Sequence, residues 1–277
     1  MIKIGVFKCG NIGTAPILEL LLDELADRKD ITVRTVTTGS KMGTEVVEES
    51  IEKIFQFSPD LLLLASPNTA APGPAGARDI LSKGGIPTIV FTDGPGKRVR
   101  KEIEAQGLGY MIIEGDPLIG ARKEFLDPIE MAIFNGQVIA VLATTVIFRI
   151  VIQQIDKLIF GLANNEELEL PRLVLDTDHI RDGADFANPY AKAKAMAAYE
   201  LLKKAAEINV RACFIEKDKE KYIPLVACSH EIVQASAELA STAREIEKYG
   251  DTVLRTPHGK SGKTKKKNQL MAQPQTD

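Results

Sequence analysis

The chain has 277 residues, of which 44% are hydrophobic and 26% are charged, and its formal net charge at pH 7 is −3. This composition indicates one large globular domain or two smaller ones, and it excludes a disordered or collagen-like protein. The three cysteines lack C-x-x-C spacing, which excludes a disulfide framework and a zinc module and favours a reducing cytoplasm.

Two features bear on location and metal binding. Residues 1–4 lack the charged, apolar and small-residue order of a signal peptide, so we expect a cytoplasmic protein. The most apolar stretch, residues 138–148, is far shorter than the roughly 20 residues that cross a membrane. We therefore predict a buried helix there and no membrane partner. The three histidines are scattered and never stand at i, i+4 spacing, so we expect no metal.

Residues 1–116 alternate short apolar runs with amphipathic helices, which is the pattern of a parallel sheet with helices on both faces. The expected strands are nearly uncharged and rich in leucine or β-branched residues, as strands covered on both faces must be. They are residues 2–7, 31–37, 61–65, 87–92 and 110–113. We therefore predict an α/β cofactor-binding domain over residues 1–116.

Residues 117–258 are predicted to be mainly helical, because the alternation stops there. An alanine seam follows the helix start at Asn188-Pro189. We expect a short hairpin of residues 212–215 and 222–226, separated by a charged turn. Residues 259–277 hold five lysines, one acidic residue and no aromatic residue. This tail is predicted to be disordered, with no nucleic-acid partner.

The loops after the expected strands are the first places to look for a site, because open parallel sheets bind ligands beyond the carboxyl ends of their strands. The first loop keeps two glycines of G-x-G-x-x-G, Gly10 and Gly13, but has Lys8 in place of the first. Backbone N–H groups there could bind an anion, with Thr14 as the helix cap. A plain tight turn is the alternative. The cofactor candidates are Lys8, Cys9, Gly10, Asn11, Gly13 and Thr14.

The second loop contains hydroxyl groups and a lysine, but no acidic residue that could hold the adenosine ribose of NAD. It could instead bind the 2′-phosphate of NADP or a phosphodiester in another cofactor. A polar turn without a ligand is the alternative. The candidates in this loop are Thr38, Gly39, Ser40 and Lys41.

The third and fourth loops are rich in proline and glycine, which indicates rigid backbone. Pro67 and Asn68 could hold the hydrogen-bonding edge of a heterocycle without further ordering, or the loop could be structural. Asp93 and Gly94 follow the fourth strand, where Asp93 could equally be a turn residue. Covalent catalysis by Cys9 has little support, because no histidine lies in these loops. A site poor in acids and bases suits direct hydride transfer.

The junction between the two predicted parts contains further charged residues, in the segment 120–128. Arg122 and Lys123 are candidates for substrate binding, although their charges could simply be solvated. Asp127 is a candidate site carboxylate or, because Pro128 follows it, a helix N-cap.

Six motifs in order along the chain resemble the coenzyme F420-dependent methylenetetrahydromethanopterin dehydrogenase family of archaea. The motifs are residues 8–11, 67–74, 106–110, 124–128, 188–191 and 254–258. The resemblance covers about residues 1–258 and leaves the lysine-rich tail outside. His258, in the last motif, is a further candidate for substrate binding.

The resemblance implies reversible hydride transfer between the methylene carbon of methylenetetrahydromethanopterin and the 5-deazaflavin coenzyme F420, in methanogenesis or one-carbon metabolism. It implies F420 as a dissociable co-substrate, no metal, no tightly bound flavin, and a homohexamer built as a trimer of dimers. The oxidised product is a cation, so a carboxylate near the reacting carbon would stabilise the transition state. Asp93 and Asp127 are the catalytic candidates.

Two residues depart from the family pattern: Thr69 replaces a usual proline and Val146 replaces a glycine. Two alternative functions stay open on the residues alone. Gly10, Gly13 and Lys41, with Ser40, also fit an NADP-dependent dehydrogenase with a Rossmann-like domain. A non-enzymatic nucleotide-binding regulator would show binding without turnover.

Overall fold

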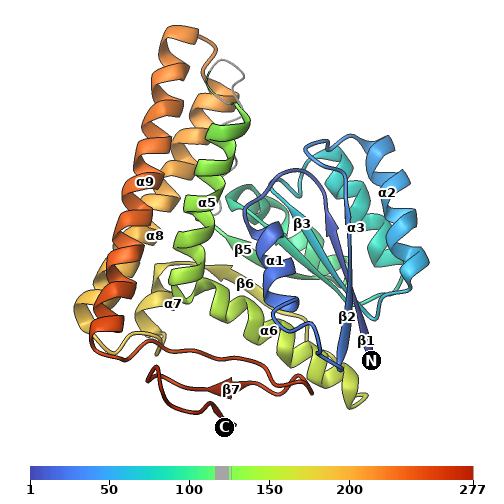
Figure 1. The fold of residues 1–277 in the computed structure, drawn as a ribbon. Helices are drawn as coiled ribbons and strands as arrows, with labels where there is room; N and C mark the ends of the chain where they lie inside the picture. The colour runs from blue at the N-terminus through green and yellow to red at the C-terminus, as the bar shows by residue number, and fades with distance from the viewer. Residues whose placement is uncertain (116–124, 126, 277) are drawn as a thin grey trace. The chain divides into compact units, whose positions relative to one another are not determined.

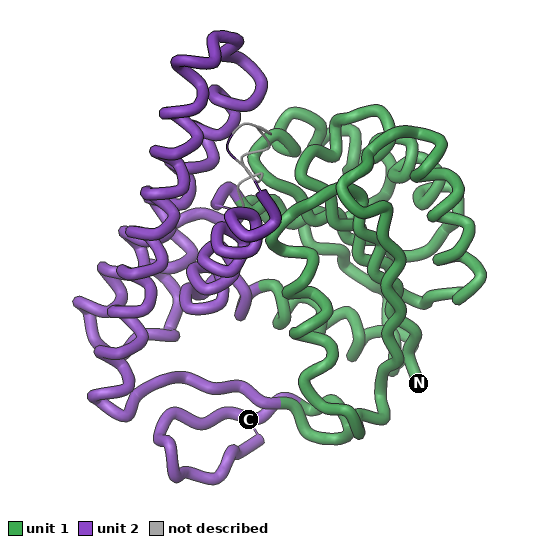
Figure 2. Tube along the Cα trace, turned by 45° about the horizontal axis from the view of Figure 1, so that its top comes forward, with its two compact units in different colours: residues 1–113, 151–174, 258–263 green, residues 114–150, 175–257, 264–277 purple. Residues whose placement is uncertain are grey.

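The computed structural model describes residues 1–115, 125 and 127–276. The chain divides into two compact units, each built from separate stretches of sequence (Figure 2). Unit 1 comprises Met1–Ile113, Val151–Val174 and His258–Lys263, and unit 2 comprises Glu114–Ile150, Leu175–Pro257 and Thr264–Asp277. The division predicted at residue 116 is close to the first of these breaks, but the chain later returns to unit 1 twice.

A six-stranded sheet forms the centre of unit 1, in the order β2-β1-β3-β4-β5-β6 (Figure 1). Neighbouring strands from β2 to β5 pair in parallel, and β3, β4 and β5 are buried along their whole length. The strands are β1 (Ile2–Lys8), β2 (Ile31–Thr37), β3 (Leu61–Ser66), β4 (Thr88–Thr92), β5 (Gly109–Ile113) and β6 (Arg172–Leu175). The predicted α/β class and all five predicted strands are confirmed. The sixth strand was not predicted.

The helices of unit 1 cover the sheet because their apolar side chains repeat at helical spacing. On one face, Val47, Ile51 and Ile54 of α2 share a buried cluster with Leu64 of β3 and Ala77 of α3. The helix α1 lies on the other face (Figure 1). The helical elements are α1 (Thr14–Leu22), α2 (Thr44–Phe57), α3 (Pro72–Lys83), the 3-10 helix η1 (Gly94–Val99) and α4 (Arg100–Ala105).

Unit 2 is mainly helical. It contains α5 (Pro128–Thr144), α7 (Thr177–Asp182), α8 (Pro189–Val210), the π-helical turn η2 (Arg211–Ile215) and α9 (Lys219–Tyr249), while α6 (Val146–Ala163) begins in unit 2 and ends in unit 1. The predicted alanine seam packs α8 against α9, and Ser236 Oγ donates to the carbonyl oxygen of Ala198 at 2.7 Å. Small side chains allow this close approach of the two helices.

The hairpin expected at residues 212–215 and 222–226 is wrong in position, because both segments are helical. Asp218 caps α9 by accepting a hydrogen bond from Glu220 N, and Tyr222 and Val226 are buried one helical turn apart. Their spacing of four residues fits a helix as well as a strand. The antiparallel pair near the C-terminus is instead β7 (Lys265–Lys266) with β8 (Gln275–Thr276).

The C-terminal tail differs from the disorder expected for it, because its backbone makes defined hydrogen bonds. Lys29 N donates to the carbonyl oxygen of Lys260, and Lys267 N donates to that of Arg255, both at 2.9 Å. Among the described residues, no single helix is long and apolar enough to span a membrane. Taken together, α5 and α6 are long and apolar enough by length and composition alone, but they are bent by 71° at the break between them.

Candidate coenzyme site

The loops after β1, β2, β3 and β4 meet at one edge of the sheet, because the strands are parallel. We call residues 8–13, 38–43, 66–71 and 92–96 the carboxyl-edge loops. Thr38 joins the first two of them. Its Oγ1 accepts a hydrogen bond from Gly10 N at 3.2 Å and donates to the Lys41 carbonyl at 2.6 Å, while its N–H donates to the Lys8 carbonyl at 3.0 Å.

The first loop is tightly packed. Gly10 has a φ of +87°, and a Cβ atom on it would lie 2.7 Å from Met42 Sδ, so both the backbone conformation and the space require glycine. Lys8 Nζ donates to Asn11 Oδ1 at 2.9 Å, and burial lowers the pKa of Lys8. Thr14 does not cap α1 as predicted. Gly13 occupies the N-cap position in helical conformation, which makes Thr14 the first helical residue, and Thr14 is fully buried.

The second loop is open to solvent. Gly39 has a φ of +67°, nothing lies within 4 Å of the place where its Cβ would stand, and Ser40 and Lys41 are exposed. An open pocket of about 590 Å³ lies beside it and is lined by residues 41–46. This loop therefore offers an exposed lysine and exposed backbone to an anion.

The third loop forms a turn that hydrogen bonds within the loop stabilise. Pro67 is buried and Asn68 is half-buried. Asn68 Oδ1 accepts a hydrogen bond from Ala70 N at 3.2 Å, and the Asn68 carbonyl accepts one from Ala71 N at 3.1 Å. This turn leaves the Nδ2 group of Asn68 without a partner among the described residues.

Three hydroxyl groups that were not predicted lie at the ends of β3 and β4. Ser66 and Thr92 face each other in the sheet register, and Thr69 follows in the loop. All three residues are at most 1% exposed, and their hydroxyl oxygens have no hydrogen-bond partner in the described part of the chain. A buried polar group without a partner costs roughly 1–3 kcal/mol, so these groups are suited to a ligand that supplies partners. A hydroxyl directly after an apolar strand is the signal that could have found them.

Asp93 is buried at the carboxyl end of β4, with 2% of its surface exposed. Its Oδ1 accepts a hydrogen bond from Gly94 N at 2.6 Å, which caps η1, and its carbonyl accepts one from Gly96 N at 2.9 Å. The short turn therefore fixes the Asp93 carboxyl group at the carboxyl end of β4.

Two candidates lie elsewhere. Asp127 is exposed in unit 2 and caps α5, accepting from Ile129 N and Glu130 N at 2.8 Å each, in agreement with the cap alternative. His258 is buried in unit 1 next to Glu24 and Asp156. Arg122 and Lys123 lie outside the described residues.

The contacts of His258 place it at the opposite edge of the sheet from the carboxyl-edge loops. Its Nε2 lies 2.8 Å from Asp156 Oδ2, its Nδ1 lies 3.1 Å from Glu24 Oε2, and its charge acts on Asp30, which directly precedes β2. The structure therefore does not bring His258 together with the other candidates.

Cys9 is fully buried, and burial raises its pKa to about 11 despite a hydrogen bond with Thr38. A thiol with this pKa is protonated at neutral pH and is a poor nucleophile. The described residues also contain no group of three or more histidine, cysteine or acidic residues that could hold a metal ion.

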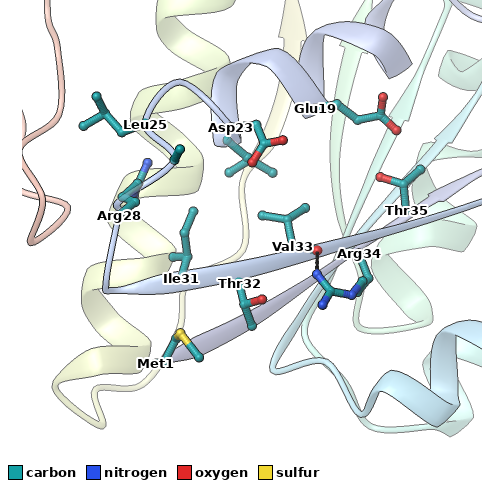
Figure 3. Close-up of a pocket in the computed structure, with 12 residues that line it drawn as sticks. Met1, Glu19, Asp23, Leu25, Arg28, Ile31, Thr32, Val33, Arg34 and Thr35 are labelled. Carbon is teal, nitrogen blue, oxygen red and sulfur yellow. Dashed lines mark hydrogen bonds between the residues drawn. The ribbon is translucent and has the colours of Figure 1, made fainter.

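A second open pocket, of about 550 Å³, lies between α1 and the outer strand β2 (Figure 3). Charged side chains line it, among them Glu19, Arg28 and Arg34, and Arg34 Nη1 donates to the carbonyl of Val33 at 2.7 Å. It contains none of the predicted site residues.

Comparisons with known proteins cover nearly the whole chain. The family model described as methylene-5,6,7,8-tetrahydromethanopterin dehydrogenase matches residues 2–275, which includes the tail that we expected to lie outside the resemblance. The F420-dependent methylenetetrahydromethanopterin dehydrogenases of Methanothermobacter marburgensis and Archaeoglobus fulgidus are 53% and 51% identical to this chain. Each match covers 99% of this chain and 100% of the relative.

A solved structure gives the same result for the fold. It is an F420-dependent methylene-tetrahydromethanopterin dehydrogenase in complex with methylene-tetrahydromethanopterin and coenzyme F420. It is similar to this chain with a TM-score of 0.96 and 45% identity, over 99% of this chain and 100% of that one. The chain therefore belongs to the methylene-5,6,7,8-tetrahydromethanopterin dehydrogenase family.

Proposed function

We propose that this chain binds coenzyme F420 at its carboxyl-edge loops and exchanges a hydride there with methylenetetrahydromethanopterin. The activity itself is that of an F420-dependent methylenetetrahydromethanopterin dehydrogenase. The observation that carries it is the match to enzymes of this activity at about half identity over full length, together with the complex of a relative with both molecules. The NADP-dependent and the non-enzymatic alternatives have no comparable support.

The carboxyl-edge loops fit a phosphodiester-bearing deazaflavin. The exposed loop with Gly39, Ser40 and Lys41 suits the anionic side chain of the coenzyme. The Nδ2 of Asn68 and the hydroxyls of Ser66, Thr69 and Thr92, which have no partner among the described residues, suit the polar edge of its ring. Asn68 is half-buried and accessible as it stands, whereas a ligand reaches the three hydroxyls only if they become exposed, because they are buried.

Hydride transfer needs no general acid or base. In the oxidative direction, the C–H bond at the methylene carbon breaks with its electron pair, and a C–H bond forms on the deazaflavin. The pterin product is a cation and loses no proton, and the deazaflavin that gained the hydride takes up one proton from water to complete its reduction. The residues of the site therefore have to align two rings and exclude water, which rigid proline and glycine loops can do.

Asp93 is our candidate for electrostatic stabilisation. Positive charge develops on the pterin as the hydride leaves, and a fixed carboxylate nearby stabilises that charge more in the transition state than in the ground state. Asp93 is held by Gly94 N and buried, so it needs little reorganisation. Asp127 is accounted for by its capping bonds.

We also propose a cytoplasmic homohexamer, built as a trimer of dimers. The three cysteines are unpaired, as in a reducing compartment. Large apolar side chains remain exposed in the single chain, such as Ile129 and Ile133 one turn apart on α5, at 67% and 51%. Such residues are typical of surfaces that an assembly covers. Light scattering tests for six copies of the 30.2 kDa chain.

A mixing assay tests the activity. The purified chain, given methylenetetrahydromethanopterin and oxidised F420, should bleach the visible absorbance of the deazaflavin, whereas NADP in its place should stay oxidised. Reduction of NADP with F420 unchanged would support the alternative dehydrogenase. Binding of either molecule without any turnover would support a regulator.

A further inference from the structure

A buried arginine from outside the third carboxyl-edge loop holds the middle of that loop. Arg78 of α3 is 2% exposed, and its Nε donates to the carbonyl oxygen of Thr69 at 3.2 Å. A guanidinium group in the interior needs acceptors for its N–H groups, because burying an unpaired charge is very costly. The loop carbonyl is one of three acceptors that it finds.

The other two acceptors lie beyond the loop. Arg78 Nη1 donates to Gln106 Oε1 at 2.6 Å, and Nη2 lies 3.4 Å from Oε2 of Glu102, whose side chain is 65% exposed. Gln106 is itself fixed: its Nε2 donates to Asp79, and its carbonyl accepts a hydrogen bond from Ser82 Oγ at 2.5 Å. The side-chain amide of Gln106 therefore keeps its oxygen turned to Arg78.

Stability alone does not account for a buried charge in this position. An apolar side chain of similar volume often stabilises a core as well as a buried ion does. What arginine adds is a planar fork with donors in fixed directions. Here the fork joins the loop carbonyl of Thr69 to Gln106 at the end of α4.

We propose that Arg78 is a positioning residue that holds Asn68 in the conformation that receives the coenzyme, a role that rests on the proposed function of this loop. The Thr69 carbonyl and the Ala70 N–H belong to the same peptide plane, so fixing the carbonyl also directs the Ala70 N–H that donates to Asn68 Oδ1. The turn around Asn68 Oδ1 then leaves its Nδ2 free to donate. A prealigned donor binds a ring without paying ordering entropy on binding.

The test compares Arg78→Lys with Ser82→Ala. Both residues belong to α3 and both bond to Gln106, but only Arg78 reaches the loop. We expect Arg78→Lys to raise KM for F420 about tenfold or more, with kcat within about threefold, and to speed hydrogen exchange at the Ala70 and Ala71 amides. Ser82→Ala should lower the thermal midpoint without either effect.

Two outcomes would overturn the role of Arg78: an unchanged KM in Arg78→Lys, or an equal rise in KM in both variants. Asn68→Ala separates this from a failure of the loop assignment. If Asn68→Ala raises KM and Arg78→Lys does not, the loop still binds coenzyme and Arg78 is structural. If neither does, the loop is not part of the coenzyme site.

Should Arg78→Lys not fold, a second variant tests the same role. Gln106→Met removes one hydrogen-bond acceptor of Arg78 and should also raise KM for F420.

Discussion

Burial separates the polar side chains at the carboxyl edge into two groups with different tasks. Lys41 and Ser40 are exposed, whereas Thr92 and Asp93 are almost completely buried. An exposed lysine contributes charge and reach, and its contacts are screened by water. A buried carboxylate or hydroxyl acts over a shorter range but more strongly, because the surrounding dielectric is lower. Coenzyme affinity and transition-state stabilisation should therefore respond to different residues.

Lys41→Ala should mainly raise KM for F420, by roughly three- to thirtyfold, because it removes one charge-assisted contact with an anion. The turnover number should change little, since the lysine acts on binding. Steady-state kinetics at several coenzyme concentrations measures both constants. Lys53→Ala is the matched control, because Lys53 is also exposed but pairs with Glu49 on α2. A KM that is the same in both variants would remove Lys41 from the site.

Asp93→Asn should lower turnover in the oxidative direction by about tenfold or more, because it removes the charge and keeps the shape. Asparagine can still accept the hydrogen bond from Gly94 N, so the thermal midpoint should stay nearly unchanged. Asp218→Asn is the control, since Asp218 is also a helix cap but is exposed. Retained activity, or a loss of stability in step with activity, would make Asp93 structural.

The loops after the strands could be predicted from the sequence, because a buried strand is visible as an apolar run. The position where that run stops locates the carboxyl end of the strand and the loop after it. Which partners close those loops could not be predicted. Met42 packs on Gly10, and Thr38 bonds to it, across about thirty residues of chain. That the Thr92 hydroxyl has no hydrogen-bond partner among the described residues depends on the whole surrounding fold. Asp127 was ambiguous because the same Asp-Pro pair begins a helix or carries a site carboxylate.

At the scale of elements, the segment His258–Lys263 fastens the loop after α1. The His258 N–H donates to Glu24 Oε1 at 2.7 Å, and Lys260 Nζ lies 2.5 Å from Asp27 Oδ2. A Cβ on Gly262 would lie 2.1 Å from an oxygen of Asp30, so the segment fits closely. Composition alone suggested a solvated tail, because lysine-rich sequence gives no sign of specific acidic partners.

The histidine of this segment should make stability depend on pH. The hydrogen bond with Asp156 raises the pKa of His258 above 6.5, more than burial lowers it. The folded state therefore binds the proton more tightly than the unfolded state. The resulting stabilisation is fully present below about pH 6.5 and is lost as pH rises through the raised pKa.

His258→Gln should remove that pH dependence and lower the thermal midpoint at pH 6 by about 2–4 °C, the shift that roughly 1 kcal/mol produces in a domain of this size. The difference in midpoint between wild type and variant should shrink as pH rises. Turnover should stay within about tenfold, because no general base is lost. His230→Gln is the control, since burial lowers the pKa of His230 and gives the opposite pH dependence. A thousandfold loss of turnover in a folded variant would instead make His258 catalytic.

Short apolar segments could not be assigned to a helix or a strand from the sequence alone, because their composition fits both. Residues 212–215 and 222–226 are apolar and short, as strands are, but the first segment lies in the π-helical turn η2 and the second in α9. In α9, Tyr222 and Val226 are buried four residues apart, whereas Phe214 and Ile215 of η2 are exposed. Tertiary packing of the two long helices decided between the two patterns. The central strands were unambiguous because they are buried on both faces.

For the whole molecule, the central claim is that the hydride passes directly between two molecules, without an acid, a base or a covalent intermediate on the protein. The described residues of the carboxyl-edge loops agree with this claim, since they supply amides, hydroxyls, two lysines and one carboxylate, and their cysteine is buried with a pKa of about 11. The full-length similarity to enzymes with both substrates agrees as well.

The most direct test follows the transferred hydrogen. The chain is given methylenetetrahydromethanopterin carrying deuterium on its methylene carbon, with oxidised F420 in ordinary water, and the reduced coenzyme is examined by mass spectrometry. When both methylene hydrogens are deuterium, direct transfer predicts one carbon-bound deuterium in each reduced F420, and no carbon-bound deuterium when the label is placed only in the water. Reduced coenzyme whose new carbon-bound hydrogen comes from the water would contradict the account.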